Sequence, residues 1–510
     1  MTALPVPAPS AGEAAPAPSP RHGAASERIP ARRIVLPALA ILYMAATQTY
    51  GLSTPREILL PLSVVVLGAI LLSSLRDPTV ILLALAAYVP FSRVYPGNFG
   101  GAITALNLTN VLTGIGILAW LKGARERGAT PVPRAPLNLP VVLFALLTIV
   151  AFLRGGMEMG NWYWEGAISN LKRWLDPFFL YFIFLGSIRR KETMLNLVIV
   201  LLKAVLAAAL MGFVEHADRL DKYPHGSDQQ RIRGISEQAN QVGSFYVYYG
   251  ALFAGLALVR PRVRRYAYLL VPFLLVVRAA QYTGSRGTLL GMATAGLAIL
   301  FVRSKPLCLG VMCLMAVVVA NPSLLPEGTQ RMLGRTFANE RETIEESLDK
   351  SAARRLMAWD AALRIIRDEP LFGVGYGLFP VVSTNYNPEL KGMDAHNTYL
   401  LLAAEMGLPA LFTFLWILGL VSSETLRLYR GAPDRFLRGV ALGFAGGLAG
   451  LVVVCMFGSR ITSFEIFAYF WILAALVVRA NALEPAAGPA PARAPARAVA
   501  PWIGGVPIRP

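Results

Sequence analysis

The chain of 510 residues carries a formal net charge of +18, and 55% of its residues are hydrophobic while only 15% are charged. Soluble proteins carry about 25% charged residues, so this composition excludes a soluble domain and predicts a polytopic membrane protein. The positive charge does not indicate nucleic-acid binding, because the basic residues lie in short loops between apolar runs, which is how membrane topology is encoded.

The chain order predicts an all-α protein between two tails. Residues 1–30 are rich in Ala, Pro and Ser and are expected to form a disordered cytoplasmic tail, and so are residues 481–510. Eleven transmembrane segments are predicted within 31–320 and three within 396–480. Several are shorter than the roughly 20 residues of a single span, so twelve spans is the alternative to fourteen. The predicted segments are 34–50, 58–75, 78–91, 105–121, 137–153, 175–188, 193–215, 240–259, 266–282, 287–302, 306–320, 397–420, 439–457 and 465–479.

The basic residues also predict the orientation of these segments. If the N-terminus is cytoplasmic, more than half of the 48 lysines and arginines fall on the cytoplasmic side, as the positive-inside rule requires. Both termini are then cytoplasmic, and residues 321–395 form one long exterior loop. A shorter exterior loop from Trp162 to Trp174 contains N-W-Y-W-E-G, whose aromatic rings suit the membrane interface or, alternatively, stacking on a sugar.

The long loop has a helical pattern of its own. Apolar residues recur there at alternating spacings of four and three, which predicts an amphipathic helix that ends before Pro370. This helix is expected to lie on the exterior membrane face, to cap a cavity or to pack on the core of the loop. The glycine-rich stretch over 371–379 is interpreted as a flexible lid or a turn. The apolar residues of the helix are Ala352, Leu356, Trp359, Leu363 and Ile366.

Polar residues gather in three sequence segments at the predicted exterior face. R-I-R-G-I-S-E-Q-A-N-Q occupies 231–241, Y-T-G-S-R-G-T-L-L occupies 282–290, and M-D-A-H-N begins at Met393. Guanidinium groups at this depth suit a phosphorylated ligand, because their planar fork pairs with phosphate oxygens. A histidine at the mouth of a span is a candidate for proton transfer.

Each of these candidates has a structural alternative. Arg233 is one helical turn before Glu237 and can pair with it. Arg286 can be an interfacial residue, Arg231 a structural one and His396 a helix cap. Glu405 lies inside an apolar run, where a carboxylate needs a partner or a function. The cysteines Cys308, Cys313 and Cys455 are odd in number and lie in apolar segments, so no disulfide is expected, and no metal-binding motif is present.

In combination, these segments resemble the O-antigen ligase/polymerase family. The resemblance rests on R-G-x-x-x-x-x-N from Arg233, G-S-R-G around Arg286, and D-A-H-N-x-Y-L…E-x-G from Asp394. S-A-A-R-R-L-M-A-W and P-L-F-G-V-G-Y-G in the long loop add to it, and it covers about residues 230–425. The family comprises bacterial integral membrane glycosyltransferases, including O-antigen ligases and Wzy-type polysaccharide polymerases. The fourteen predicted segments exceed the twelve or so that are usual for the ligases.

The resemblance implies an inverting, metal-independent glycosyl transfer at the periplasmic face of the bacterial inner membrane, with no cofactor. The donor would be a glycan on undecaprenyl pyrophosphate, and the acceptor a glycan or lipid A-core. Arg233 and Arg286 would hold the pyrophosphate, and His396 would position or deprotonate the acceptor hydroxyl. Arg231, Asn397 and Glu405 are the further candidates for substrate binding.

The favoured function is a Wzy-type polymerase of a surface polysaccharide, acting with a chain-length regulator and a flippase. An O-antigen ligase is the first alternative, and transfer to a protein hydroxyl is the next. A transporter or flippase is the rival from another class. It would place charged residues at the membrane midplane, where only Lys203 and Glu405 are found.

Overall fold

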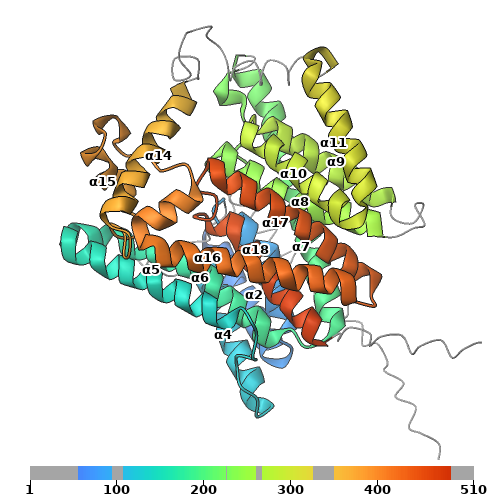
Figure 1. Cartoon of the computed structure of the whole chain (residues 1–510). Helices are drawn as coiled ribbons and strands as arrows, with labels where there is room; N and C mark the ends of the chain where they lie inside the picture. Colours follow the sequence, from blue (N-terminus) through green and yellow to red (C-terminus); the bar gives the residue numbers. More distant parts are fainter. Residues whose placement is uncertain (1–55, 95–106, 225–226, 260–266, 325–349, 484–510) are drawn as a thin grey trace, which may run out of the picture.

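A computed structural model describes residues 56–94, 107–224, 227–259, 267–324 and 350–483. Within these ranges the protein is helical and contains no β-strand, which confirms the all-α class (Figure 1). The predicted segment 34–50, the predicted tail 1–30 and residues 484–510 of the other predicted tail lie outside the described residues. Every later predicted segment overlaps a helix, because runs of apolar residues satisfy their backbone hydrogen bonds internally in a membrane only as helices. Residues 481–483, predicted as the start of the C-terminal tail, instead complete α18 (Phe464–Leu483), where the Asn481 side chain donates to the Glu424 carbonyl at 2.9 Å.

The α-helices occur in the following order along the chain: α2 (Arg56–Arg76), α3 (Thr79–Tyr88), α4 (Leu108–Glu126), α5 (Asn138–Met159), α6 (Asn161–Ser187), α7 (Lys191–Lys222), α8 (Ala239–Val259), α9 (Leu270–Tyr282), α10 (Arg286–Arg303), α11 (Lys305–Ala320), α14 (Lys350–Asp368), α15 (Phe379–Val382), α16 (Thr398–Gly431), α17 (Arg435–Val454) and α18 (Phe464–Leu483). Short 3₁₀ turns extend some of them, such as η1 (Val89–Phe91) after α3 and η8 (Cys455–Phe457) after α17.

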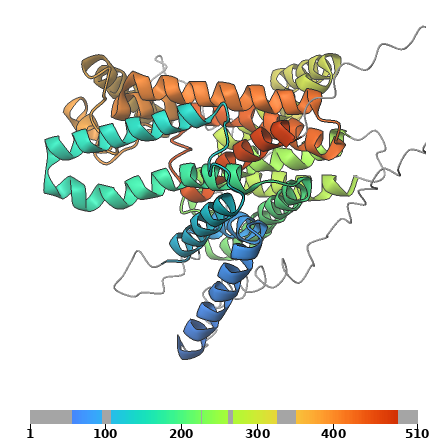
Figure 2. The same ribbon diagram turned by 90° about the horizontal axis from the view of Figure 1, so that it is seen from below.

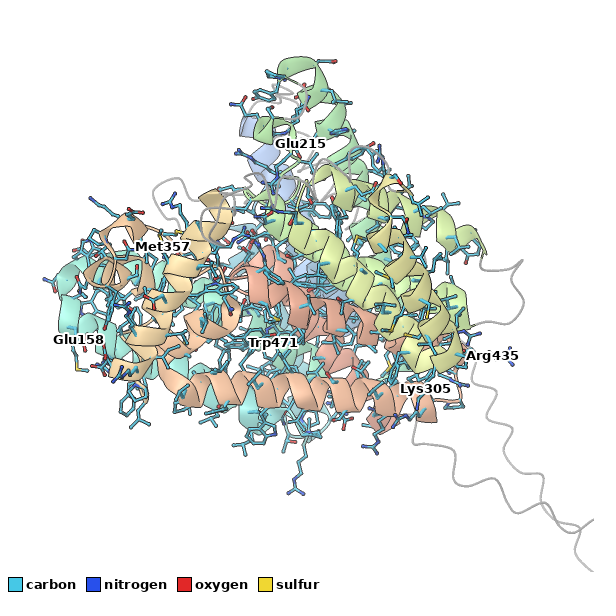
Figure 3. All side chains as sticks on the ribbon, turned by 45° about the horizontal axis from the view of Figure 1, so that its top comes forward. Glu158, Glu215, Lys305, Met357, Arg435 and Trp471 are labelled. Atoms are coloured by element: carbon cyan, nitrogen blue, oxygen red, sulfur yellow. The ribbon has the colours of Figure 1, made fainter. Side chains whose placement is uncertain are left out.

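Seven helices of the described part are long and apolar enough to cross a membrane, namely α5, α7, α8, α10, α16, α17 with η8, and α18. Four shorter apolar helices accompany them, at Val65–Arg76, Thr79–Phe91, Leu270–Tyr282 and Lys305–Val318. The protein is therefore a polytopic membrane protein. The total of twelve to fourteen spans stays a prediction. Figure 3 labels Lys305 and Arg435 at the opposite end of the molecule from Glu158 and Met357.

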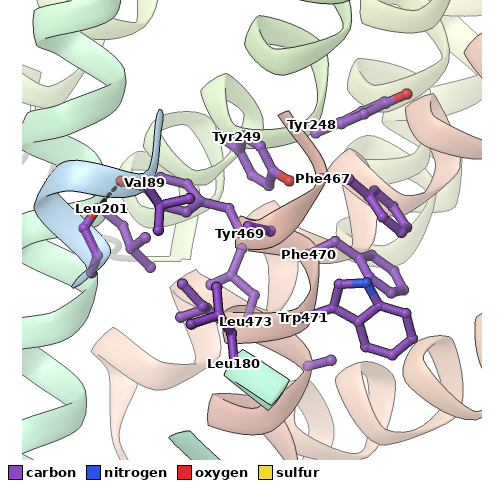
Figure 4. Close-up of a cluster of buried hydrophobic side chains, with 14 of the residues drawn as sticks. Val89, Leu180, Leu201, Tyr248, Tyr249, Phe467, Tyr469, Phe470, Trp471 and Leu473 are labelled. Atoms are coloured by element: carbon purple, nitrogen blue, oxygen red, sulfur yellow. Dashed lines mark hydrogen bonds between the residues drawn. The ribbon is translucent and has the colours of Figure 1, made fainter. Parts of the chain in front are cut away.

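The main core is centred on α18, which is buried along most of its length between α6, α8 and α16. Trp471 and Tyr469 are fully buried there among aromatic neighbours (Figure 4). Two tyrosine hydroxyls of this core donate to backbone carbonyls. The Tyr249 hydroxyl donates to the Ile466 carbonyl at 2.7 Å, and the Tyr469 hydroxyl donates to the carbonyl of Ala86 on α3. These bonds join α18 to α8 and to α3.

Helices α8 and α17 pack closely against each other. A side chain on Gly255 of α8 would place its Cβ only 2.2 Å from the backbone nitrogen of Gly443 of α17. Gly439 and Gly447, one turn on either side of Gly443, also meet α8 closely. Small residues at four-residue spacing let membrane helices approach backbone to backbone, so the two helices form one rigid unit.

The long loop is supported by a hairpin from the N-terminal half. Helices α5 and α6 extend alongside α16 (Figure 2), and their ends contact α14 and the glycine-rich segment. The Tyr163 hydroxyl of α6 donates to the Tyr376 carbonyl at 2.6 Å, and Arg154 of α5 forms an ion pair with Glu369 at 3.0 Å. The segment Trp162–Trp174, expected as a loop, is instead part of α6, because its rings pack on Phe152 and the backbone continues the helix.

The predicted amphipathic helix is confirmed as α14, which ends at Asp368, two residues before Pro370. Its buried face differs from the predicted one. Leu356 and Leu363 are exposed, Leu363 by 57%, whereas the residues that pack inward are mostly small. Alanines allow α14 to lie close to the loop's own core, so the helix buries Ala358, Ala361, Ala362 and Ile365.

Candidate active site at the start of helix α16

His396 has an unusual backbone conformation immediately before α16. Its φ of +50° makes it the one non-glycine residue with a positive φ among those the structure describes. Such a left-handed conformation costs a non-glycine residue about 1–3 kcal/mol and is found most often at functional sites. The next residue, Asn397, caps α16 by accepting hydrogen bonds from the backbone nitrogens of Tyr399 and Leu400 at 2.9 and 3.2 Å. The cap therefore fixes the start of α16 and, with it, the position of His396 just before the helix.

The imidazole of His396 lies beside a carboxylate, and the charges of several arginines act on it. Its Nδ1 is 4.0 Å from Oδ2 of Asp394, whose other oxygen accepts a hydrogen bond from the Ser459 hydroxyl at 2.8 Å. Burial lowers the pKa of His396; Asp394 opposes this shift, and the cations Arg355, Arg460 and Arg354 add to it. The ring is therefore neutral at neutral pH and able to accept a proton.

A pocket of about 540 Å³ opens at this histidine. Its size falls in the usual range for ligand sites, roughly 300–1,000 Å³. The lining combines the proton acceptor with cations and hydrogen-bonding groups from three separate segments of the chain. These residues are Gln238, Arg354, Lys391, Gly392, Met393, Asp394 and His396. Gln238 belongs to the segment 231–241, so the structure brings the first and third polar segments together at this pocket.

The second polar segment is joined to the first by backbone and side-chain hydrogen bonds. The Ile232 nitrogen donates to the Tyr282 carbonyl at 3.2 Å. Arg231 donates from Nε to the Thr283 carbonyl at 2.7 Å and from Nη2 to Asn240 at 2.6 Å. Gly284 has φ +58°, and Arg231 packs directly over its Cα. Arg231 is therefore positioned to hold the two segments together. This is the structural role that was given above as the alternative to substrate binding.

Arg233 and Arg286 differ in their surroundings. The backbone nitrogens of Arg233 and Gly234 bind the Glu215 carboxylate at 2.7–3.1 Å, and this leaves the exposed Arg233 side chain directed away from the core. Glu237 does not pair with Arg233, because its carboxylate binds Arg93 at 2.6 Å. Arg286 is half-buried as the first residue of α10, where Ser285 caps the helix by accepting from the Thr288 nitrogen.

Glu405 lies outside the pocket lining and binds the glycine-rich segment. Its oxygens accept hydrogen bonds from the backbone nitrogens of Gly377 at 2.9 Å and Phe379 at 3.1 Å. Helix α16 is interrupted two residues later at Gly407, with φ 81° and ψ 169°, and the Leu408 nitrogen donates to the Pro370 carbonyl. The stretch over 371–379 is thus a turn fixed to α16. We call Glu405 and this turn the glutamate clamp.

The sequence reasoning did not single out four residues near His396. Three of them, Gln238, Arg354 and Lys391, line the pocket. Arg460 lies between α17 and α18, where its backbone nitrogen donates to the Thr398 hydroxyl at 3.1 Å. The sequence held a signal for Arg460, because an arginine in a short loop that is predicted to be exterior departs from the positive-inside rule.

One protein-family model matches part of the chain. Residues 271–415 match the family model described as O-Antigen ligase. The matched range includes Arg286, helix α14, the glutamate clamp and His396, but not the segment 231–241 or Arg460. No curated protein sequence matches the chain. Residues 271–415 of this chain are thus similar to the O-Antigen ligase family, and the matched range holds two of the three polar segments on which the resemblance rests.

Proposed function

We propose that the protein is a bacterial inner-membrane glycosyltransferase that uses a glycan on undecaprenyl pyrophosphate as donor at the periplasmic face. The observation that carries this proposal is the pocket in which His396 stands beside Asp394, with Arg354 and Lys391 in the same lining. A proton acceptor and cations around one cavity are what transfer from a pyrophosphate donor to a hydroxyl needs.

The reaction is a direct displacement. An acceptor hydroxyl gives its proton to neutral His396 as its oxygen attacks the anomeric carbon. The bond from that carbon to the pyrophosphate oxygen breaks, and the lipid pyrophosphate leaves with the electron pair. Because attack and departure occur on opposite faces, the anomeric configuration inverts. Arg286 and Arg233 neutralise the charge that develops on the leaving group, so protein cations perform this role in the scheme, and neither a metal nor another cofactor enters it.

The acceptor distinguishes the candidate functions. We favour a Wzy-type polymerase, in which the acceptor is another lipid-linked repeat unit and a chain-length regulator and a flippase act with the enzyme. An O-antigen ligase, with lipid A-core as acceptor, is the second candidate, and the description of the matched family favours it. Transfer to a protein hydroxyl ranks below both, and so does a transporter. The proposal also puts both termini in the cytoplasm.

The size of the lipid-linked glycans that accumulate in a deletion strain separates the first two candidates. Single repeat units on undecaprenyl pyrophosphate are expected if polymerisation is lost. Long polymer still attached to the lipid would instead assign the ligase function. Purified protein in detergent cannot transport, so glycosyl transfer under these conditions would rule out a transporter as the sole function.

A further inference from the structure

Arg460 lies in a short connection that is bound to the His396 segment at several points. The Thr398 hydroxyl donates to the Gly458 carbonyl at 2.8 Å and accepts from the Arg460 nitrogen at 3.1 Å. One residue earlier, Ser459 donates to Asp394. The connection between α17 and α18 is therefore attached to the pocket wall, although the family match does not reach it.

The guanidinium of Arg460 is buried, with only 6% of the residue exposed. Its Nη2 donates to the Phe457 carbonyl at 3.2 Å, and its buried Nε has no hydrogen-bond partner among the described residues. No described carboxylate forms an ion pair with it. Arg93 and Arg154 are more exposed, yet each of them contacts two carboxylates. A buried cation without a counter-ion is strongly unfavourable, so this charge is expected to have a purpose.

The nearby carboxylates are already committed elsewhere. Asp394 binds Ser459 and approaches His396, and it attracts Arg460 only from beyond ion-pair distance. Glu465, at the start of α18, faces Arg93 at 3.8 Å. With Arg354 and Lys391 in the pocket lining, the wall around His396 holds more positive than negative charge. The pocket therefore selects an anion with several oxygens, and a phosphate group is the ligand that fits.

Building on the proposed function, we propose that Arg460 supplies an uncompensated positive charge to the His396 pocket and that the phosphate groups of the donor are its counter-ion. Arg460 acts as a positioning residue, since it lies behind the wall that Asp394 and His396 form. Binding of the pyrophosphate stabilises the buried guanidinium, and the guanidinium in turn holds the leaving group near the proton acceptor. Its charge also keeps His396 unprotonated.

The test compares Arg460→Met and Arg460→Lys with the wild type, using purified protein in detergent and farnesyl pyrophosphate as the probe. A purely structural arginine would make the ligand-free Arg460→Met protein less stable. Here the ligand-free variant is expected to unfold at the wild-type temperature or above it, because an unpaired buried charge has been removed. Its Kd for the probe is expected to rise about 10-fold or more, with Arg460→Lys in between.

Arg427→Met is the matched control, because this arginine is 65% exposed near the other end of α16. It is expected to leave both the unfolding temperature and the Kd unchanged. Glycerol phosphate serves as a headgroup control. If it binds as tightly as farnesyl pyrophosphate and also depends on Arg460, the site takes phosphate headgroups in general, and assignment to the donor is overturned.

The remaining outcomes separate this inference from the proposed function. If wild-type protein does not bind farnesyl pyrophosphate, the proposed donor is wrong and the inference fails with it. If the wild type binds and Arg460→Met binds equally well, only the role of Arg460 fails.

The pH dependence of transfer activity gives a second readout, through the limb where activity falls as the pH is lowered. This acid limb is expected to move to higher pH in Arg460→Met, because loss of this cation raises the pKa of His396 while Asp394, Arg354, Arg355 and Lys391 remain.

Discussion

His396 lies just before α16 and Glu405 lies about two turns inside it, and the surroundings of the two residues are opposite. Glu405 is buried, and both of its oxygens accept backbone hydrogen bonds. His396 is part-exposed in a left-handed conformation, in a pocket whose nearby cations outnumber its carboxylates. Satisfied polar groups stabilise a structure, whereas strained and unsatisfied ones are maintained where a substrate completes them. The comparison separates Glu405, which holds the turn in place, from His396, which is proposed to react.

The largest expected effect is the loss of transfer in His396→Asn. Asparagine tolerates the left-handed backbone and keeps a polar side chain, but it cannot accept the proton. Activity is expected to fall by about 10²–10⁴-fold, the usual contribution of a general base, while the unfolding temperature stays near the wild-type value. Transfer by purified protein, measured beside thermal unfolding, checks this. Near-normal activity would remove His396 from the mechanism.

Glu405→Ala is expected to act through stability instead. It leaves the backbone nitrogens of Gly377 and Phe379 without their acceptor, which costs about 1–3 kcal/mol for an unsatisfied buried group. The unfolding temperature falls, and proteolytic cleavage within 371–379 becomes faster. Activity decreases because the turn no longer holds α16. If Glu405→Ala abolishes transfer with unchanged stability and unchanged cleavage, Glu405 belongs to the reacting site.

Two glycines of the clamp give a matched pair with a smaller effect. Both Gly373 and Gly377 have positive φ, +64° and +73°, so alanine at either position costs about 1–2 kcal/mol of backbone strain. A Cβ on Gly373 would also lie 2.4 Å from the carbonyl carbon of Glu405, whereas one on Gly377 would meet nothing within 4 Å. Gly373→Ala is therefore expected to lower the unfolding temperature more. Equal effects would contradict the close contact of turn and helix.

The sequence predicted the parts of this site that depend on local pattern. Apolar runs predicted the helices, apolar periodicity predicted α14, and His396 was predicted at the start of α16, whereas the pocket lining contains neither Arg286 nor Arg233. The sequence did not predict that Glu237 binds Arg93, or that α14 buries its alanines, because both depend on which helices pack together across more than a hundred residues of chain. The N-cap role of Asn397 was readable locally, since asparagine before an apolar run is a common helix start.

The smallest effect is expected in Asp394→Asn, which alters the pH dependence of transfer. Transfer needs neutral His396, so activity falls as pH drops through the pKa of the histidine, which lies below its ordinary value because burial and the arginines disfavour the charged ring. Asp394 opposes that shift, and its Oδ1 position accepts from Ser459 in either variant. Removing its charge lowers the pKa of His396 further, so the acid limb moves to lower pH. The move is expected to be less than about one pH unit, because the pair is 4.0 Å apart and part-exposed. Asp368→Asn, which changes an exposed carboxylate bound to Tyr386 in the same loop, should leave the limb in place. A shift of the acid limb toward higher pH in Asp394→Asn would contradict this electrostatic role. Asp394 would then act mainly by orienting the imidazole of His396, and the left-handed backbone at His396 would not be sufficient to orient the ring without it.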